Sequence, residues 1–230
     1  MSVKINYKNN FLKKNSSNLV LFSDENFNIS GLKNHISSKE HYFIKDLIKN
    51  MDIKKKILSF DISSKKKIIL VSIKKNIKSY DAENLGAKFY DLFKDLKINH
   101  FNLNSDSISD NLKNIVGYFL HGLKLKSYAF EKYKSKKKNK NILITVTGKN
   151  KPLIKDQTKF KAIEEGSFCT RDLVSEPGNI LHPDEYAKRL NSFKKYGLKV
   201  NIYDDKKLKK LGMNTLLGVG QGSIRGSYLV

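Results

Sequence analysis

The 230-residue sequence has one cysteine, very little arginine and no long apolar run. The single cysteine, Cys169, excludes a disulfide within the chain, which fits a reducing compartment. No segment approaches the roughly 20 apolar residues that a membrane-spanning helix needs. Residues 1–8 contain no apolar run typical of a signal peptide. We therefore expect a cytoplasmic protein with no membrane partner.

The charge of the chain is strongly basic, at +23, yet only three of the 45 basic residues are arginine. A field of this sign attracts polyanions. Bidentate contacts to phosphates and bases, however, favour the guanidinium group of arginine over lysine. Lysines occur in scattered runs such as 65–67 and 136–138, in a chain rich in Asn and Ile, as genome-wide AT bias would produce. Two readings stay open: a solvated lysine surface, and a surface that binds DNA.

Short apolar segments alternate with helical patterns over the first 150 residues, which predicts an α/β domain. The β-rich runs predict strands at 3–7, 19–22, 57–62, 68–73, 100–103 and 141–146. Apolar residues at three- and four-residue spacing predict two helices, one capped by Ser79 or Asp81 and one capped by Ser107 or Ser109. Their apolar stripes are Leu85, Phe89, Leu92, Phe93 and Leu96, and Leu112, Ile115, Val116, Phe119, Leu120 and Leu123. The lysine-rich run 134–140 is expected to be a solvated connector.

The second part of the chain begins with a predicted helix that contains Phe160, Ile163, Phe168, Leu173 and Val174. A Pro-Gly turn at 177–178 ends it, and Pro183 opens the next helix at its first position. Further along, the pattern predicts a strand at 199–203, a short helix at 208–211, a strand at 215–219 and the start of a strand at 228–230.

Four acidic residues near these helix ends, Asp172, Glu176, Asp184 and Glu185, have the chemistry of hard metal ligands. We favour a structural role for these four residues. Asp184 and Glu185 occupy the first turn of a helix, where the helix macrodipole attracts negative charge. We expect Cys169 to be a buried small apolar residue rather than a nucleophile.

The histidines show no paired metal-binding spacing such as His-Glu-x-x-His, so each is expected to be a surface or satisfied core residue: His35, His41, His100 and His121. The glycine-rich run 218–223 follows a predicted strand, as a dinucleotide-binding loop would. A strand start at 228–230 follows it instead of a helix, which excludes that interpretation.

Three segments in the same order resemble the leucyl aminopeptidase (cytosol aminopeptidase) family. The first is 117–138, with the pattern Gly-x-x-Leu-x-x-Tyr-x-Phe-x-x-Tyr-Lys-Ser, read from its residues alone as an amphipathic helix with aromatic residues near its end. The second is 169–183, which contains the Pro-Gly turn, and the third is 211–223, whose glycines suggest a loop pressed against another backbone. His182 departs from the family pattern, in which Thr or Ser caps the helix, so we expect weaker capping here.

The resemblance implies a mixed-sheet, macro-like N-terminal domain at 1–150, a linking helix at 151–175, and an incomplete α/β/α metallopeptidase domain at 176–230. In the family, two divalent ions (Mn or Zn) catalyse removal of N-terminal amino acids from peptides, and the enzyme forms a hexamer, a homo-oligomer. The family's metal-ligand motifs are absent from this sequence. We therefore expect no catalytic, cofactor-binding or metal-binding residue in the chain, and interpret it as truncated and inactive alone.

Two alternatives stay open. One is a non-catalytic, lysine-rich macro-like module that binds DNA or an ADP-ribose-like nucleotide. The other is a genuinely short regulator that joins the family's hexamer.

Overall fold

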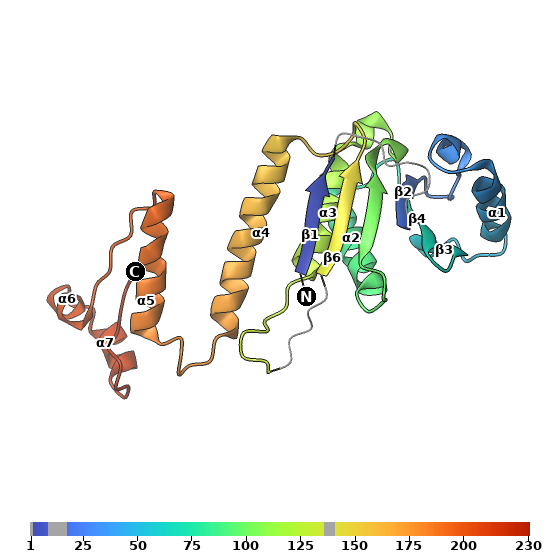
Figure 1. Cartoon of the computed structure of the whole chain (residues 1–230). Helices are drawn as coiled ribbons and strands as arrows, with labels where there is room; N and C mark the ends of the chain where they lie inside the picture. The colour runs from blue at the N-terminus through green and yellow to red at the C-terminus, as the bar shows by residue number, and fades with distance from the viewer. Residues whose placement is uncertain (1, 9–17, 136–140) are drawn as a thin grey trace. The chain divides into compact units, whose positions relative to one another are not determined.

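The computed structural model describes residues 2–8, 18–135 and 141–230. The predicted connector at 134–140 lies mostly outside these residues, and its lysine run 136–138 lies entirely outside them. The chain divides into two compact units, residues 1–168 and residues 169–230 (Figure 1).

A six-stranded mixed sheet forms the centre of the first unit, with the strand order β1-β6-β5-β2-β4-β3. All six predicted strands are present: β1 Ser2–Tyr7, β2 Asn18–Ser23, β3 Ile57–Ser63, β4 Lys66–Ser72, β5 His100–Asn104 and β6 Asn141–Thr147. The pairs β1–β6, β6–β5, β5–β2 and β2–β4 are parallel, and β3 pairs with β4 antiparallel at one edge. The predicted mixed α/β fold of this unit is thereby confirmed.

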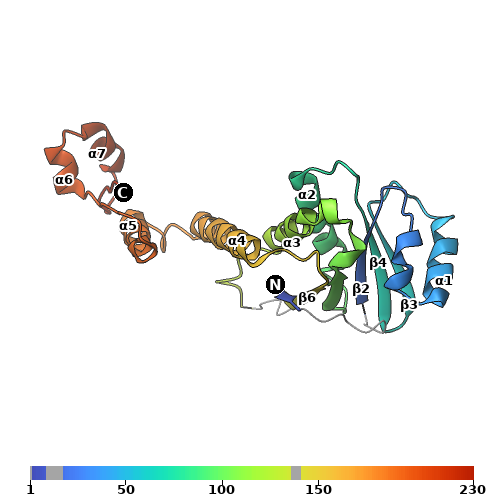
Figure 2. The same ribbon diagram turned by 90° about the horizontal axis from the view of Figure 1, so that it is seen from above.

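Helices cover both faces of this sheet, and a hydrophobic core lies on each face. Strand β2 contributes side chains to both cores. Helix α1 (Ser38–Ile48) and the 3-10 turn η1 (Ser30–Asn34) lie on one face, and α2 (Ser79–Phe93) and α3 (Asn114–Lys126) lie on the other (Figure 2). Successive side chains of a strand point to opposite faces. Leu21 therefore packs toward α1, whereas Phe22 packs toward α2 and α3.

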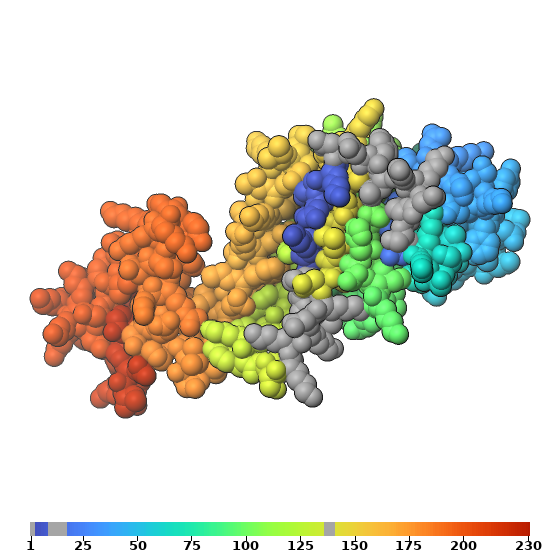
Figure 3. All heavy atoms as spheres, viewed as in Figure 1, coloured from blue at the N-terminus to red at the C-terminus, as the bar shows by residue number. Residues whose placement is uncertain are grey.

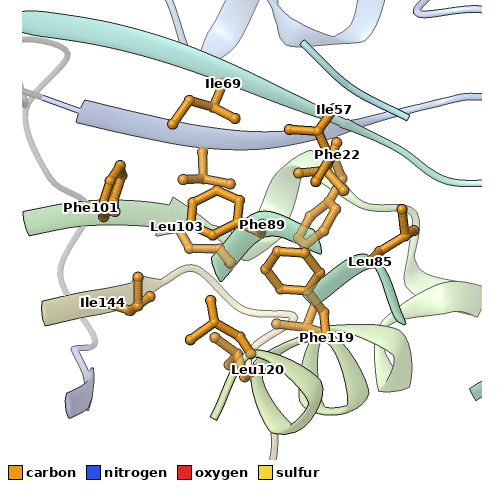
Figure 4. Close-up of a cluster of buried hydrophobic side chains, with 14 of the residues drawn as sticks. Phe22, Ile57, Ile69, Leu85, Phe89, Phe101, Leu103, Phe119, Leu120 and Ile144 are labelled. Atoms are coloured by element: carbon orange, nitrogen blue, oxygen red, sulfur yellow. The ribbon is translucent and has the colours of Figure 1, made fainter. Parts of the chain in front are cut away.

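Four phenylalanines join the sheet to α2 and α3 in the larger core (Figure 4). The ring of Phe119 meets that of Phe22 at a centroid distance of 5.5 Å, and the ring of Phe89 meets those of Phe101 and Phe119 at 5.4 and 5.7 Å. All three contacts are edge-to-face, the arrangement that aromatic rings favour over flat stacking. This cluster holds the two helices against the sheet.

Several boundaries in the first unit differ from the sequence prediction. Neither Ser79 nor Asp81 caps α2, which begins after Lys78 without a side-chain cap. Helix α3 begins only at Asn114, and Ser107 instead belongs to the short 3-10 turn η2 (Ser105–Ser107). Helix α2 ends at Phe93, so Leu96 lies outside the helix that was expected to contain it.

The aromatic residues expected at the end of α3 lie beyond it. The helix ends at Lys126 with Ser127 as its C-cap, and Tyr128 and Phe130 follow. The Ser127 hydroxyl donates to the carbonyl of Lys124, 2.7 Å away, and this contact competes with continuation of the helix.

Helix α4 (Ile154–Ser175) confirms the helix predicted through Phe160 and Phe168. The Phe160 ring covers Gly117 of α3, where a Cβ would lie 2.7 Å from the ring. Ile163 and Val174 were also expected on the apolar stripe, but both are exposed. None of the described helices combines the length and apolarity needed to cross a membrane.

The second unit contains three further helices: α5 Pro183–Asn191, α6 Asp205–Lys210 and α7 Asn214–Gly220. The predictions of the helices at Pro183 and near 208 are confirmed. The predicted strand at 215–219 is wrong, because this segment is helix α7; a short apolar run cannot be assigned to strand or helix by periodicity. The strand predicted at 199–203 is reduced to one antiparallel bridge, between Tyr203 and Leu229.

Candidate functional site

The turn between α4 and α5 has the form that the sequence predicts. Helix α4 ends at Ser175, and the backbone N–H groups of Ile180 and Leu181 both donate to the carbonyl of Pro177, each at 2.9 Å. Pro183 then stands in the first turn of α5. The expected weak capping is also present, because His182 is the N-cap residue and its side chain accepts no backbone hydrogen bond.

Three of the four acidic residues suspected as metal ligands, Glu176, Asp184 and Glu185, bind cationic side chains instead. Arg189 donates to Glu185 at 2.9 Å and to Glu176 at 3.2 Å. Asp184 contacts His182 and accepts from Arg225 at 3.4 Å. The hydrogen bond from Arg189 lowers the pKa of Glu185. These contacts support the structural role that we favoured for the carboxylates.

No dinuclear metal centre fits the residues that surround this turn. Across residues 2–8, 18–135 and 141–230, no three His, Cys, Asp or Glu side chains gather closely enough to hold a metal ion. Arg189 supplies positive charge where a metal site would need free carboxylates. The ion pairs of Arg189 tie α5 to the turn that follows α4.

The glycine-rich run after α6 also differs from the expectation. Gly218 and Gly220 belong to α7 rather than to a loop that follows a strand. A Cβ added at Gly218 or Gly222 would meet nothing within 4 Å, and at Gly220 it would meet only the Ser227 side chain. The expectation of a loop pressed against another backbone is therefore wrong for the described residues.

Three of the histidines have the satisfied contacts expected of structural residues. They are His35 with the Asn104 amide at 2.9 Å, His41 with the Ile29 carbonyl at 3.2 Å and His100 with the Thr145 hydroxyl at 3.0 Å. Cys169 is half-buried rather than buried, which corrects the prediction for that residue.

The fourth histidine forms a buried pair with an acid that the sequence did not connect to it. His121 Nδ1 of α3 lies 2.9 Å from Glu164 Oε1 of α4, and the two residues are 5% and 8% exposed. The pair borders a cavity of about 790 Å³ between β1, α3 and α4. Figure 3 shows the side chains of β1 and of the first part of α4 next to each other at this place. The pair couples α4 to α3 across 43 residues of sequence.

Replacement of His121 by phenylalanine is expected to lower the free energy of unfolding by about 1–3 kcal/mol, because the buried Glu164 carboxylate loses a hydrogen-bond donor. The double variant His121→Phe/Glu164→Leu removes both polar groups and is expected to recover most of that loss. Urea unfolding of the two variants and of Glu164→Leu measures the coupling. Strictly additive effects would show that the two side chains do not interact.

Tyr7 of β1 lines the same cavity, and burial followed by the charge of Glu164 raises its pKa to about 12. In the unfolded chain, tyrosine ionises near pH 10, roughly two units lower. Between these values the unfolded chain releases this proton first, so the Tyr7 contribution to stability is complete below about pH 10 and falls as the pH rises. Tyr7→Phe is expected to show a shallower loss of unfolding free energy between pH 10 and 12. Parallel curves for the two proteins would contradict this assignment.

The second unit matches a known family in sequence. Residues 168–230 match the model of the cytosol aminopeptidase family, catalytic domain. The probable cytosol aminopeptidase of Phytoplasma mali is 44% identical over 119 residues, which cover 49% of this chain and 24% of that protein. The corresponding protein of Bradyrhizobium sp. is 40% identical over 116 residues, 47% of this chain and 23% of that protein. The matched segment thus spans about a quarter of each relative.

The fold is similar to that of a solved leucine aminopeptidase and of a solved bottromycin maturation enzyme. A mutant of tomato leucine aminopeptidase superposes with a TM-score of 0.80 at 18% identity, covering 99% of this chain and 50% of that one. The bottromycin maturation enzyme BotP in complex with Mn gives a TM-score of 0.67 at 14% identity, covering 92% and 44%. At these identities the likeness concerns the fold alone.

Proposed function

We propose that this chain is the N-terminal, scaffold portion of a metal-dependent aminopeptidase of the leucyl (cytosol) aminopeptidase family, to which it is similar in sequence. The observation that carries the proposal is the match of residues 168–230 to the family's catalytic-domain model. In this proposal the mixed sheet of residues 1–150 is a macro-like N-terminal domain, 151–175 is the linking helix, and 176–230 begins the catalytic domain.

The proposed dinuclear centre, with Mn or Zn, is built from polypeptide outside these 230 residues. This part of the proposal is supported by the pairing of Glu176 and Glu185 with Arg189, which leaves neither acid as an uncommitted ligand. The proposed substrates are peptides with a free N-terminus. The proposed setting is the cytoplasm, and the proposed assembly is a hexamer formed by the complete enzyme.

An activity assay tests the proposal in both directions. The purified 230-residue chain, given Mn²⁺ or Zn²⁺ and a leucyl chromogenic amide, is expected to show no turnover above the blank. A chimera in which this chain replaces the corresponding N-terminal part of the Phytoplasma mali protein is expected to cleave the same substrate, with the unaltered relative as the control. Turnover by the chain alone, or a folded and assembled chimera without activity, would contradict the proposal.

The net charge of +23 supports a second proposal, that the chain also binds DNA through its lysine-rich surface. Binding that releases counterions weakens steeply with salt, with a slope of about −0.9 for each phosphate neutralised. A titration of duplex DNA at several salt concentrations measures this slope. Weak binding with a slope near zero would favour the plain alternative, a solvated lysine surface.

A further inference from the structure

The chain leaves two neighbouring parallel strands of the first unit in opposite directions. After β2 it leads to η1 and α1 on one face of the sheet, and after β5 it leads through η2 to α3 on the other face. In open α/β sheets, such a divergence leaves a crevice at the carboxyl ends of the strands, where ligands bind. This is a property of the topology and holds independently of the proposed peptidase function.

A crevice is present at this point, with a volume of about 470 Å³. This is within the range of small-molecule pockets, about 300–1,000 Å³. Ile108 and Leu112 give it an apolar side, and the carboxylates of Asp24 and Asp106 also line it. Among the described residues that line it, Lys75 is the one cation, so there two acids face one base. That balance favours a neutral ligand with hydroxyl donors over a phosphorylated one.

The walls of the crevice are held by hydrogen bonds within the chain. Asp24 Oδ1 accepts from the backbone N–H groups of Asn26 and Asn28, at 3.1 and 2.8 Å. Phe27, between them, adopts a left-handed backbone with φ 54° and is buried in the core beneath α1. A bulky residue in this region of φ is strained, and such strain persists only where the surroundings enforce it. The loop after β2 is thus fixed in shape before any ligand arrives.

The opposite wall is tied to the sheet in the same way. Ser107 Oγ accepts from the backbone N–H of Phe22 at 2.9 Å and donates to the carbonyl of Asn104 at 2.6 Å. Asp106 Oδ1 accepts from the backbone N–H of Lys149. Both carboxylates therefore have fixed positions, with one oxygen engaged by the backbone.

One buried hydroxyl in the crevice lacks a partner. Ser23 at the end of β2 is 8% exposed and lines the crevice, and its Oγ makes no hydrogen bond to any residue that the structure describes. Leaving a buried hydroxyl unsatisfied is unfavourable, so a ligand group that bonds to it would be stabilised. Ser72, its register partner on β4, is 2% exposed and also has no hydrogen-bond partner among the described residues, but it does not line the crevice. The two serines form a matched pair for an experiment.

We propose that this crevice binds a nucleoside. The ribose hydroxyls donate to Asp24 and Asp106, as acidic residues at such a switch point bind a ribose diol, and Ser23 supplies a further hydrogen bond. The base packs on the apolar side formed by Ile108 and Leu112. The two carboxylates disfavour a phosphate in the same place.

Calorimetric titration of the 230-residue chain with adenosine tests the proposal. One adenosine is expected to bind per chain. 2′,3′-Dideoxyadenosine is expected to bind at least about tenfold more weakly, because it lacks both hydroxyl donors of the ribose diol. AMP is expected to bind no more tightly than adenosine. Ser23→Ala is expected to weaken adenosine binding several-fold, whereas Ser72→Ala leaves it unchanged. Gly31→Trp places a side chain at the crevice where a Cβ meets nothing within 4 Å, and is expected to abolish binding.

Circular dichroism of each variant shows that the fold is retained before the titrations are compared. No adenosine binding at millimolar concentration would overturn the proposal. So would equal affinities for adenosine and the dideoxy analogue, tighter binding of AMP, or binding that survives Gly31→Trp in a folded chain.

Discussion

Gly122→Ala is expected to destabilise the first unit severely. Helices α2 and α3 approach so closely that a Cβ at Gly122 would lie 2.0 Å from the backbone carbonyl oxygen of Glu83. Gly86 on α2 has the reciprocal contact, with its Cβ position 1.9 Å from the carbonyl oxygen of Phe119. Backbone atoms cannot move aside as the end of a flexible side chain can, so the helices must separate. Overpacking typically costs about 1–3 kcal/mol and occasionally more, and we expect the upper end here because the contacts are with backbone atoms.

Gly166→Ala is the matched control, because this glycine is also inside a helix, α4, but its Cβ position meets nothing within 4 Å. There the substitution is expected to stabilise the chain by about 0.5–1 kcal/mol, since alanine favours the helix more than glycine does. Urea unfolding followed by circular dichroism compares the two variants. A Gly122→Ala chain as stable as the parent would show that α2 and α3 are not packed through these glycines.

Phe89→Ala is expected to lower the free energy of unfolding by about 3–5 kcal/mol, the usual cost of removing a buried phenylalanine. Phe89 is 1% exposed, and its ring centroid lies 4.7 to 5.7 Å from those of Phe93, Phe101 and Phe119. The substitution therefore opens a cavity among three rings that belong to different elements. These elements cannot all close around the space, so most of the lost packing is not recovered.

Leu92→Ala on the same helix is the control for Phe89→Ala, because Leu92 is 55% exposed. Its loss is expected to change the midpoint of denaturation by only a small fraction of the Phe89 effect. The comparison requires that the slope of unfolding free energy against denaturant concentration is the same for both variants. Equal losses at the two positions would contradict the core described for this face of the sheet.

The sheet could be predicted from the sequence because its strands are short runs of Ile, Val, Leu and Phe between turn residues. Strand β2 illustrates this, since Leu21 and Phe22 both pack in cores and the run is apolar on both faces. Parallel strands covered on both sides have this pattern. The strand order could not be predicted, because the pattern shows that a strand is buried but does not identify its neighbours.

Helix α1 was missed, although the sequence contained a signal for it. Ser37 and Glu40 form a capping box, in which the Ser37 side chain accepts from the Glu40 N–H and the Glu40 carboxylate accepts from the Ser37 N–H. The apolar pattern that follows is misleading, because Tyr42 and Phe43 are exposed while Ile44 is buried. The capping signal, rather than periodicity, marked the start of this helix.

The second unit could be predicted in outline but not in its contacts. The Pro-Gly turn and Pro183 marked the helix boundaries, because proline removes a backbone donor and restricts φ. The bridging role of Arg189 had no signal, since Glu176 lies 13 residues away and across the turn. The segment that forms α7 was predicted to be a strand, because Leu216, Leu217 and Val219 suit a strand or a helix when their tertiary neighbours are not known.

The proposed function depends most on the claim that the proposed catalytic ions bind to polypeptide outside these 230 residues. Titration of the purified 230-residue chain with Mn²⁺, followed by the loss of the electron paramagnetic resonance signal of the free ion, measures this directly. We predict no saturable uptake, and the same weak response from a variant carrying Asp184→Asn and Glu185→Gln. Saturable binding of two ions per chain, abolished in that variant, would contradict the account.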